Sequence, residues 1–322
     1  MIEVKNLSKY YQEKAAVDHI SFRIHAGETM ILLGTSGCGK TTTMKMINRL
    51  VEPSSGQVML DGKDIRTLRP ETLRRNIGYV IQNVGLFPHY TVKQNINLVP
   101  SLLNWSDKEI QERFYELMAL MGLDDELQNR YPHELSGGQQ QRVGVARALA
   151  AKPDLILLDE PFGALDPITK QQIQSEFLKL KALRQTTKLM VTHDVFEAVT
   201  LGDKICLMNA GKIQQTGTPH ELVFHPKDAF VREFFDAQRF RLELQVLKLK
   251  DLLELTEVGN EPPTDVEQAI RIGSGASLLE SLDQLERKDT EWLIIDHEQQ
   301  EVILNRTKLL QLFYQRKESY RN

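Results

Sequence analysis

The chain has 322 residues, of which 41% are hydrophobic and 26% charged, a composition typical of folded globular domains rather than of disordered or membrane-embedded chains. The formal net charge of -4 provides no basic surface of the kind that nucleic-acid binding requires, so we expect no nucleic-acid partner. The length favours a large domain followed by a smaller one. The two cysteines, Cys38 and Cys206, are too few for a secreted disulfide framework and indicate a reducing compartment.

The amino-terminal residues 1–5 alternate between polar and apolar and lack the charged-then-apolar order of a secretory signal. Apolar runs such as 30–33 and 155–158 have the length of strands, far below the roughly 20 residues that cross a bilayer. We therefore expect a cytoplasmic chain whose contact with a membrane comes through a partner.

The first two thirds of the chain predict an α/β fold. Residues 1–62 are typical of strands joined by turns with one helix at 41–50, and we expect an antiparallel β subdomain at the N-terminus. The strand at 29–33 leads into a glycine-rich turn. Apolar residues recur at helical spacing between 92 and 151, which predicts an inserted helical subdomain. Short apolar runs separated by helical stretches indicate buried parallel strands at 155–158, 189–191 and 205–208.

Residues 34–41, GTSGCGKT, match the phosphate-binding loop G-x-x-x-x-G-K-[ST] between a predicted strand and a predicted helix. Glycines let backbone amides turn toward phosphates, Lys40 can reach the β- and γ-phosphate oxygens, and the Thr41 hydroxyl can bind magnesium. A chance glycine turn is the alternative for this motif alone. We expect ATP and Mg2+ as ligands of a P-loop (RecA-like) core. The predicted nucleotide-binding residues here are Gly34, Thr35, Ser36, Gly37, Cys38, Gly39, Lys40, Thr41 and Thr42.

The apolar run at 155–158 ends in two carboxylates, Asp159 and Glu160. In P-loop enzymes such a strand lies beside the phosphate loop. Asp159 is therefore predicted to hold magnesium, and Glu160 to polarise the water that attacks the γ-phosphate. A solvated strand end is the alternative for the pair alone, and the phosphate loop outweighs it.

A second glycine-rich motif, LSGGQ at 135–139, precedes a predicted helix at 140–150. Its small residues and free amides at a helix N-terminus predict a second anion site. An ordinary serine N-cap is the alternative for Ser-Gly-Gly alone, although the following QQR makes the motif rarer. The residues of this site are Ser136, Gly137, Gly138 and Gln139.

With this motif the sequence resembles the ABC (ATP-binding cassette) ATPases, whose signature motif is LSGGQ. The resemblance implies that Gln82 is the Q-loop glutamine, which senses magnesium and the γ-phosphate, that Asp166 belongs to the D-loop, and that His193 is the switch histidine. It places Tyr11 as the aromatic residue that stacks on adenine, with Tyr10 as the weaker candidate. The expected catalytic residues are Glu160, His193 and Gln82, and the expected metal-binding residues are Thr41, Gln82 and Asp159.

The resemblance also implies a homodimer. Two chains would close head to tail, so that the phosphate loop of one chain and Ser136 and Gly138 of the other enclose each ATP. Hydrolysis would let the dimer reopen and drive alternating access in an integral membrane permease. The chain would then work at the cytoplasmic face of the cell membrane, and an extracytoplasmic solute-binding protein would be an indirect partner.

Within the ABC ATPases, the sequence is most similar to those of quaternary-amine importers for glycine betaine, choline or carnitine, which serve in osmoprotection. This resemblance rests on residues 40–56, 78–92, 130–135 and 160–170 and extends over roughly 2–235. An importer of another cargo, such as ergothioneine or an amino acid, stays an alternative. A soluble ABC ATPase of translation or DNA repair is a further one, although such proteins usually carry tandem cassettes or coiled-coil insertions, which this sequence lacks.

The chain is expected to contain an ATPase domain at 1–238, a linker at 239–260, a small α+β domain at 261–316 and a tail at 317–322. Within the small domain the pattern predicts helices and a strand pair. The predicted helices are at 276–285 and 308–314, and the predicted strands are at 292–295 and 302–304.

The small domain resembles a single CBS (cystathionine-β-synthase) module. Such modules work in pairs, so the resemblance implies pairing across the homodimer. Val302 and Lys308 stand where the family's ligand-binding stretch carries Gly and Asp. Dimer support, nucleotide sensing and a purely structural appendage are therefore all open for this domain.

Overall fold

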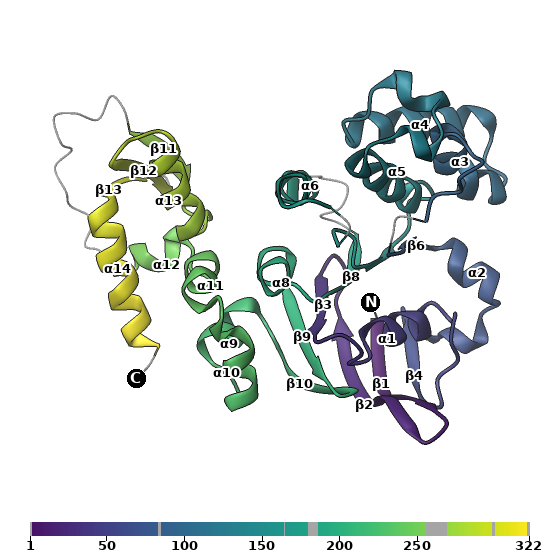
Figure 1. Cartoon of the computed structure of the whole chain (residues 1–322), viewed down its shortest axis with the longest axis horizontal. Helices are drawn as coiled ribbons and strands as arrows, with labels where there is room; N and C mark the ends of the chain where they lie inside the picture. The colour runs from purple at the N-terminus through teal and green to yellow at the C-terminus, as the bar shows by residue number, and fades with distance from the viewer. Residues whose placement is uncertain are drawn as a thin grey trace. The chain divides into compact units, whose positions relative to one another are not determined.

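The computed structural model describes residues 2–82, 85–163, 165–179, 186–255, 269–297 and 300–320. The chain divides into two compact units, Met1–Thr216 and Gly217–Asn322 (Figure 1). Among the described residues, no helix combines the length and the apolar character needed to cross a bilayer.

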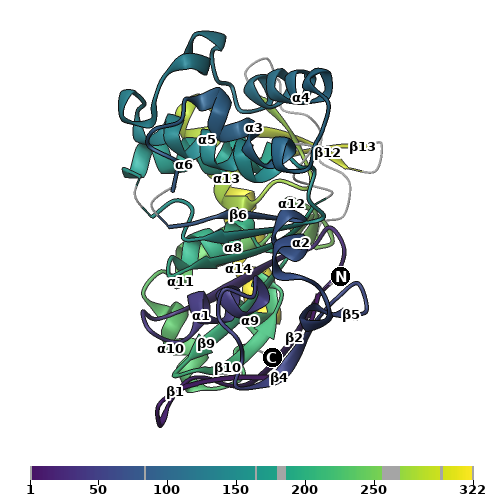
Figure 2. The same ribbon diagram turned by 90° about the vertical axis from the view of Figure 1, so that its right-hand side faces the viewer.

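The first unit opens with an antiparallel sheet whose strands run in the order β2-β1-β4-β5. The long hairpin of β1 and β2 (Figure 2) turns at Gln12, whose φ of 53° lies in the left-handed region that tight turns use. The antiparallel β subdomain expected at the start of the chain is confirmed. Its strands are β1 (Ile2–Tyr11), β2 (Lys14–Ile24), β4 (Ser55–Leu60) and β5 (Lys63–Asp64).

A six-stranded sheet in the order β10-β9-β3-β8-β7-β6 forms the centre of the unit. Four neighbouring pairs, β9–β3, β3–β8, β8–β7 and β7–β6, are parallel, as the buried apolar runs predicted. The strands are β3 (Thr29–Gly34), β6 (Ile77–Val80), β7 (Leu155–Asp159), β8 (Thr187–Thr192), β9 (Lys204–Asn209) and β10 (Lys212–Gly217).

Helices cover both faces of this parallel sheet, which explains why β3 is buried throughout. Met30 and Leu32 belong to the core shared with α1 (Lys40–Ile47), whereas Ile31 lies beside Gly202 at the end of α8 (Val195–Leu201). Alternate residues of a strand point to opposite faces, so a continuous apolar run packs against a helix on each side.

The helical subdomain consists of α3 (Val92–Leu102), α4 (Asp107–Leu120) and α5 (Gly137–Leu149), which lie together in Figure 1. Each helix begins with a capping box, in which the N-cap side chain and the third helical residue bond each other's backbone N–H. Between the helical subdomain and β8 lies α6 (Pro167–Lys179), and α2 (Pro70–Arg75) precedes β6. The predicted inserted helical subdomain is therefore present.

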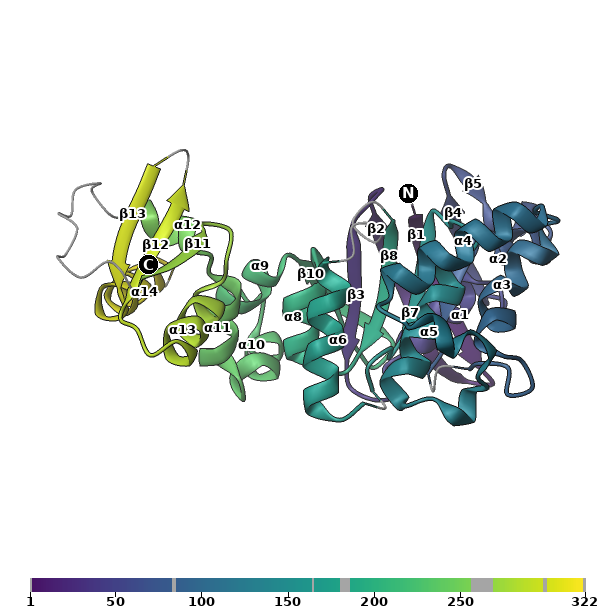
Figure 3. The same cartoon turned by 90° about the horizontal axis from the view of Figure 1, so that it is seen from above.

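The second unit contains a three-stranded sheet in the order β11-β12-β13, with α13 and α14 beside it (Figure 3). The predicted strand pair is confirmed, because β12 and β13 pair antiparallel. Strand β11, which pairs parallel to β12, was not predicted. The elements are α9 (Pro219–Phe224), α10 (Ala229–Asp236), α11 (Arg239–Val246), α12 (Leu249–Leu253), β11 (Ile270–Gly273), α13 (Leu278–Arg287), β12 (Trp292–His297), β13 (Gln300–Asn305) and α14 (Arg306–Ser319).

The boundary of the second unit differs from the expected one. Residues 239–253, expected to be part of a linker, form α11 and α12, and Leu244, Leu247 and Leu252 belong to the core around the second sheet. Residues 217–238 join this unit as well. These short helices bury apolar side chains against core residues that lie far along the chain, such as Leu293 and Phe313, and no motif marks them in the sequence. The Glu-Pro-Pro turn at 261–263 lies outside the described residues.

A close backbone contact joins the helical subdomain to the sheet and yields a test of the fold. A Cβ added at Gly78 would lie 2.5 Å from the Ala148 carbonyl oxygen of α5. Gly78→Ala should therefore lower the free energy of unfolding by about 1–3 kcal/mol, because the strand and the helix must separate. Urea unfolding followed by Trp105 fluorescence, in a Trp292→Phe background, measures the loss.

Gly273 provides the matched control, because a Cβ there meets nothing within 4 Å. Gly273→Ala, followed by Trp292 fluorescence in a Trp105→Phe background, should change the free energy of unfolding by less than about 0.5 kcal/mol. Equal effects of the two substitutions would contradict the described contact between β6 and α5.

Candidate functional site

Four loops carry the predicted site residues at one edge of the parallel sheet. The phosphate loop follows β3, Gln82 follows β6, Glu160 follows β7 and His193 follows β8. Parallel strands end at a common edge, and α/β proteins bind ligands in the crevice outside these carboxyl ends. Strands that are distant in sequence therefore deliver their polar side chains to one place, as Gln82 and Glu160 show, which are 78 residues apart.

The phosphate loop depends on glycines at its two ends. Gly34 has a φ of 152°, and a Cβ there would lie 2.2 Å from the Met208 carbonyl oxygen. Gly39 has a φ of 104°, and its Cβ would lie 2.4 Å from the Ala16 carbonyl oxygen. Any larger residue would clash with backbone at both positions, so these glycines let the loop pass close to β9 and β2.

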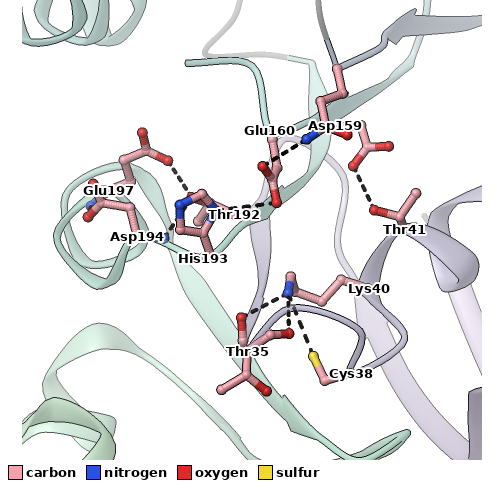
Figure 4. Close-up of polar contacts among 12 residues, drawn as sticks. Thr35, Cys38, Lys40, Thr41, Asp159, Glu160, Thr192, His193, Asp194 and Glu197 are labelled. Atoms are coloured by element: carbon pink, nitrogen blue, oxygen red, sulfur yellow. Dashed lines mark hydrogen bonds and ion pairs between the residues drawn. The ribbon is translucent and has the colours of Figure 1, made fainter. Parts of the chain in front are cut away.

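Lys40 is buried and its ammonium group lies within the loop. Its Nζ donates hydrogen bonds of 2.8 Å to the carbonyl oxygens of Gly34 and Thr35, and it lies 3.7 Å from the Cys38 sulfur (Figure 4). Thr35, at the tip of the loop, is exposed. The loop thus surrounds a fixed positive charge while its tip faces solvent.

A hydrogen bond from the turn between β9 and β10 also holds the phosphate loop, and the sequence analysis did not predict it. The Gly211 N–H donates a hydrogen bond of 3.2 Å to the Cys38 carbonyl oxygen. Gly211 and Ala210 form the turn between β9 and β10, and both have positive φ, 80° and 45°. Two successive residues with positive φ between two strands suit a primed hairpin turn, and the Asn-Ala-Gly sequence was the signal that could have located it.

Asp159 and Thr41 meet beside the loop. The Thr41 hydroxyl donates a hydrogen bond of 3.0 Å to Oδ1 of Asp159 (Figure 4). Asp159 is buried, and burial raises the pKa of its carboxyl group above the ordinary value. Burial also raises the pKa of Tyr79 to about 12, with the Asp159 charge adding to the rise, so the neighbouring phenol stays neutral.

Glu160 lies between Gln82 and His193. Gln82 Nε2 donates a hydrogen bond of 3.1 Å to Oε2 of Glu160, and His193 Nδ1 lies 3.3 Å from Oε1 (Figure 4). Both oxygens of the carboxylate therefore contact side chains from neighbouring loops. The three residues expected to be catalytic are brought together.

The backbone of Glu160 adopts an uncommon conformation. Its φ of 45° places a residue other than glycine in the left-handed region, at a cost of order 1–3 kcal/mol. Two hydrogen bonds hold it there: the Glu160 N–H donates to the Val191 carbonyl oxygen at 3.0 Å, and the Gly163 N–H donates to the Glu160 carbonyl oxygen at 3.1 Å. Such strain is typical of functional sites and here turns the carboxylate toward Gln82 and His193.

The LSGGQ residues lie at the start of α5, where they contact one another and also the α6 region. The Gln139 N–H donates to the Ser136 hydroxyl oxygen, and Gln139 Oε1 accepts from the Ser136 N–H. A Cβ on Gly137 would lie 3.8 Å from Leu165, and one on Gly138 3.1 Å from Thr169. Ser136 and Gly137 are exposed, and the Ser136 hydroxyl can still donate a hydrogen bond.

Asp166 caps α6. Its Oδ1 accepts hydrogen bonds of 3.1 Å from the N–H groups of Ile168 and Thr169. Hydrogen bonds from Thr169 and Ile168 lower the pKa of this exposed carboxyl group. Asp166 therefore fixes the first turn of α6 next to the LSGGQ motif, and it makes no described contact with the phosphate loop.

Tyr11 lies at the end of β1, opposite Lys14 of β2. Its ring is half exposed, and Lys9 Nζ lies 5.2 Å from the ring centroid. The same hairpin touches the phosphate loop through Ala16 and Gly39. Tyr10 is engaged differently, since its hydroxyl donates to Asp18 at 3.2 Å.

The residues present fit a bound nucleotide phosphate and magnesium. A loop whose end glycines, Gly34 and Gly39, leave no room for a Cβ, around a buried lysine, has the shape of a phosphate cradle. Thr41 and Asp159 provide two adjacent hard oxygen donors, and Mg2+ is commonly bound by one or two such groups together with phosphate oxygens and water. Among the described residues, no cluster of three His, Cys, Asp or Glu could hold a metal by itself.

Comparison with known proteins identifies relatives of this chain. The ABC transporter family matches residues 17–163. The choline transport ATP-binding protein OpuBA of Bacillus subtilis is 54% identical over 240 residues, which are 74% of this chain and 63% of OpuBA. This chain therefore matches less than two thirds of OpuBA.

Another relative matches over a larger share of its length. The glycine betaine/carnitine/choline transport ATP-binding protein OpuCA of Bacillus subtilis is 49% identical over 274 residues, 84% of this chain and 72% of OpuCA. Among solved structures, a dimeric ATP-binding cassette in a post-hydrolysis state bound to ADP and Pi has a TM-score of 0.60 and 33% identity. That match covers 68% of this chain and 98% of the cassette.

The burial of Asp159 leads to a pH-dependent prediction. Because its folded pKa is raised, its contribution to stability is present at acid pH and is lost as the pH rises through that pKa. Asp159→Asn is uncharged and can still accept the Thr41 hydrogen bond. It should raise the free energy of unfolding at neutral pH, measured by urea unfolding without nucleotide, and the gain should shrink at acid pH.

Asp166→Asn is the matched control with the opposite sign. The lowered pKa of Asp166 means that its stabilising contribution is present at neutral pH and is lost as the pH falls. This variant should therefore be less stable than the wild type at neutral pH. Destabilisation by Asp159→Asn under the same conditions would contradict the described burial.

Proposed function

The chain belongs to the ATP-binding proteins of ABC transporters, and on this basis we propose that it hydrolyses ATP in a head-to-tail dimer to drive solute uptake through a separate membrane permease. One observation carries the proposal: the Glu160 carboxylate, held by Gln82 and His193, lies at the sheet edge that also bears the phosphate loop and Asp159.

Binding of ATP is assigned to the phosphate loop and the β1–β2 hairpin. The backbone amides of residues 35–42 and the Lys40 ammonium would hold the β- and γ-phosphates. On binding, Lys40 exchanges its hydrogen bonds with the Gly34 and Thr35 carbonyl oxygens for phosphate oxygens. The half-exposed ring of Tyr11 offers a flat apolar surface to the adenine.

Magnesium, when bound, neutralises charge that develops on the phosphate oxygens. The Thr41 hydroxyl and the Asp159 carboxylate would hold the magnesium ion. The carboxylate would bind it directly or through a water molecule. Gln82 would bind the metal as well, and because its side chain donates a hydrogen bond to Glu160, it would report the presence of metal and γ-phosphate to the catalytic carboxylate.

Hydrolysis is assigned to Glu160 and His193. The Glu160 carboxylate accepts a proton from the attacking water, and the strained backbone keeps it aimed at that water. His193 contacts the same carboxylate and can donate a hydrogen bond to the γ-phosphate. These charged interactions are stronger where bulk water is excluded. A second chain that closes over the phosphate loop would exclude this water.

The second chain would contribute its LSGGQ residues. Ser136 and Gly137 are exposed at the start of α5, and the hydroxyl of Ser136 is free to donate to a phosphate. Ser136, Gly138 and Gln139 of one chain and the phosphate loop of the other would clamp the γ-phosphate from opposite sides, with Asp166 at the contact between chains. The dimeric assembly of the similar cassette bound to ADP and Pi supports this arrangement.

The permease would dock near the Q-loop. Phe87 and Tyr90 are exposed and their ring centroids lie 5.4 Å apart, and exposed aromatic side chains commonly anchor protein interfaces. This docking would place the chain at the cytoplasmic face of the membrane. A solute-binding protein outside the membrane would reach it only through the permease.

We assign quaternary amines of the choline, carnitine and glycine betaine class as the cargo. The similarity to the choline and the glycine betaine/carnitine/choline transport ATP-binding proteins of Bacillus subtilis supports the assignment. For the second unit we propose a CBS-like role in pairing two copies of the chain, supported by its β11-β12-β13 sheet and its own apolar core.

The Glu160→Gln variant tests the ATPase assignment. It should bind ATP as tightly as the wild type, whereas turnover should fall by about 100- to 10,000-fold, because the amide cannot accept the proton of water. Phosphate release and equilibrium nucleotide binding measure the two effects. Glu71→Gln, an exposed carboxyl on α2, should retain wild-type turnover, and normal turnover of Glu160→Gln would refute the assignment.

Reconstitution with the permease tests the cargo. In lipid vesicles that contain the permease and its solute-binding protein, choline, carnitine or glycine betaine should stimulate ATP hydrolysis. Sulfate, an unrelated amino acid and ergothioneine serve as comparison solutes in the same assay. Stimulation by one of these and none by choline, carnitine or glycine betaine would overturn the cargo assignment but leave the ATPase assignment intact.

A further inference from the structure

A lysine of α6 bridges two acidic residues of the segment that carries His193. Lys170 Nζ lies 2.7 Å from Oδ2 of Asp194 and 2.6 Å from Oε1 of Glu197. The Glu197 side chain is only 4% exposed and that of Lys170 22%. One ammonium group therefore offsets two carboxylates in a largely desolvated place, where an unpaired charge is costly.

The same network fixes both neighbours of His193. The Thr192 hydroxyl donates to Glu197, and the Asp194 N–H donates to the Thr192 hydroxyl oxygen at 3.0 Å (Figure 4). Oδ1 of Asp194 caps α8 by accepting from the N–H groups of Phe196 and Glu197 at 2.9 and 3.1 Å. His193, held between these two residues, contacts Glu160.

Helix α6 also touches the LSGGQ motif. A Cβ added at Gly138 would lie 3.1 Å from the side chain of Thr169 and 3.4 Å from that of Ile173, both of this helix. Gln174, one turn beyond Lys170, donates a second hydrogen bond to Oε1 of Glu197, at 3.0 Å. One helix thus contacts the start of α5 on one side and the His193 segment on the other.

We propose that Lys170 is a positioning residue for ATP hydrolysis, which holds His193 against Glu160 and couples the position of the LSGGQ motif to that contact through α6. The inference rests on the proposed ATPase function and deepens it. A shift of α6 moves the Lys170 ammonium group, and the two carboxylates that flank His193 follow it.

Removing the charge of Lys170 distinguishes a role in positioning His193 from a role in stabilising the fold alone. Lys170→Met keeps the length of the side chain but leaves Asp194 and Glu197 to repel each other. The His193 segment must then shift, whereas the phosphate loop, which makes no described contact with Lys170, keeps its shape. The turnover step should suffer, and nucleotide binding should not.

The experiment compares purified full-length wild type, Lys170→Met and Lys170→Arg. We expect kcat of Lys170→Met to fall by about 100-fold, the loss typical of a misplaced catalytic group, with KM and the Kd for ATP within about twofold of wild type. Lys170→Arg keeps the positive charge and should recover most of kcat. Thermal unfolding of each variant is measured alongside.

Lys204→Met is the matched control, because Lys204 pairs with Glu28 at 3.0 Å in the same unit away from the site. It should keep wild-type kcat. If Lys170→Met does not fold, the double variant Lys170→Met with Glu197→Gln removes the repulsion between the two carboxylates, and it should fold and still show the low kcat.

Wild-type kcat in a folded Lys170→Met chain would overturn the inference and leave the proposed function standing. A parallel loss of kcat, ATP affinity and thermal stability, without recovery in Lys170→Arg, would reduce Lys170 to a structural ion pair and overturn it as well. Absence of ATP turnover in the wild-type chain would overturn the proposed function itself.

Discussion

The parallel pairing of β3, β8, β7 and β6 is the constraint on which the site depends. It places the ends of four strands at one edge, so that Gln82, Glu160 and His193 meet although they are far apart in sequence. Parallel strands need long crossover connections, and here the crossovers contain the helical subdomain and α6. The elements that connect the strands are therefore also those that carry the LSGGQ motif and Lys170.

Several features that lower the stability of the folded chain lie at this edge of the sheet. Glu160 adopts a left-handed backbone conformation, Asp159 carries a carboxyl whose pKa is raised by burial, and Gly34 and Gly39 give up conformational freedom at close backbone contacts. Each feature opposes folding, and each suits the binding of a charged phosphate and its metal. The parallel sheet, packed by helices on both faces, supplies the stability that offsets these costs.

Sequence predicts the parts of this molecule whose signals are local. The phosphate loop, β3 and α1 were predicted because the motif contains its own strand, turn and helix, and the apolar runs of β7, β8 and β9 indicated buried parallel strands. Contacts set by tertiary packing left no such signal. The Gly211 anchor of the phosphate loop and the Lys170 network each join segments more than 20 residues apart. Helices α11 and α12 lie where a linker was expected, because Leu244, Leu247 and Leu252 are buried in a core whose other members lie far along the chain.

We propose that ATP bound at this sheet edge is enclosed by the LSGGQ motif of a second chain. The rate at which ATP leaves the Glu160→Gln chain, measured with and without the additional substitution Ser136→Arg, tests this enclosure. Release should be slow from Glu160→Gln and at least about tenfold faster from the double variant, because affinity differences between related complexes appear mainly in dissociation rates. Equal release rates from the two chains would contradict it.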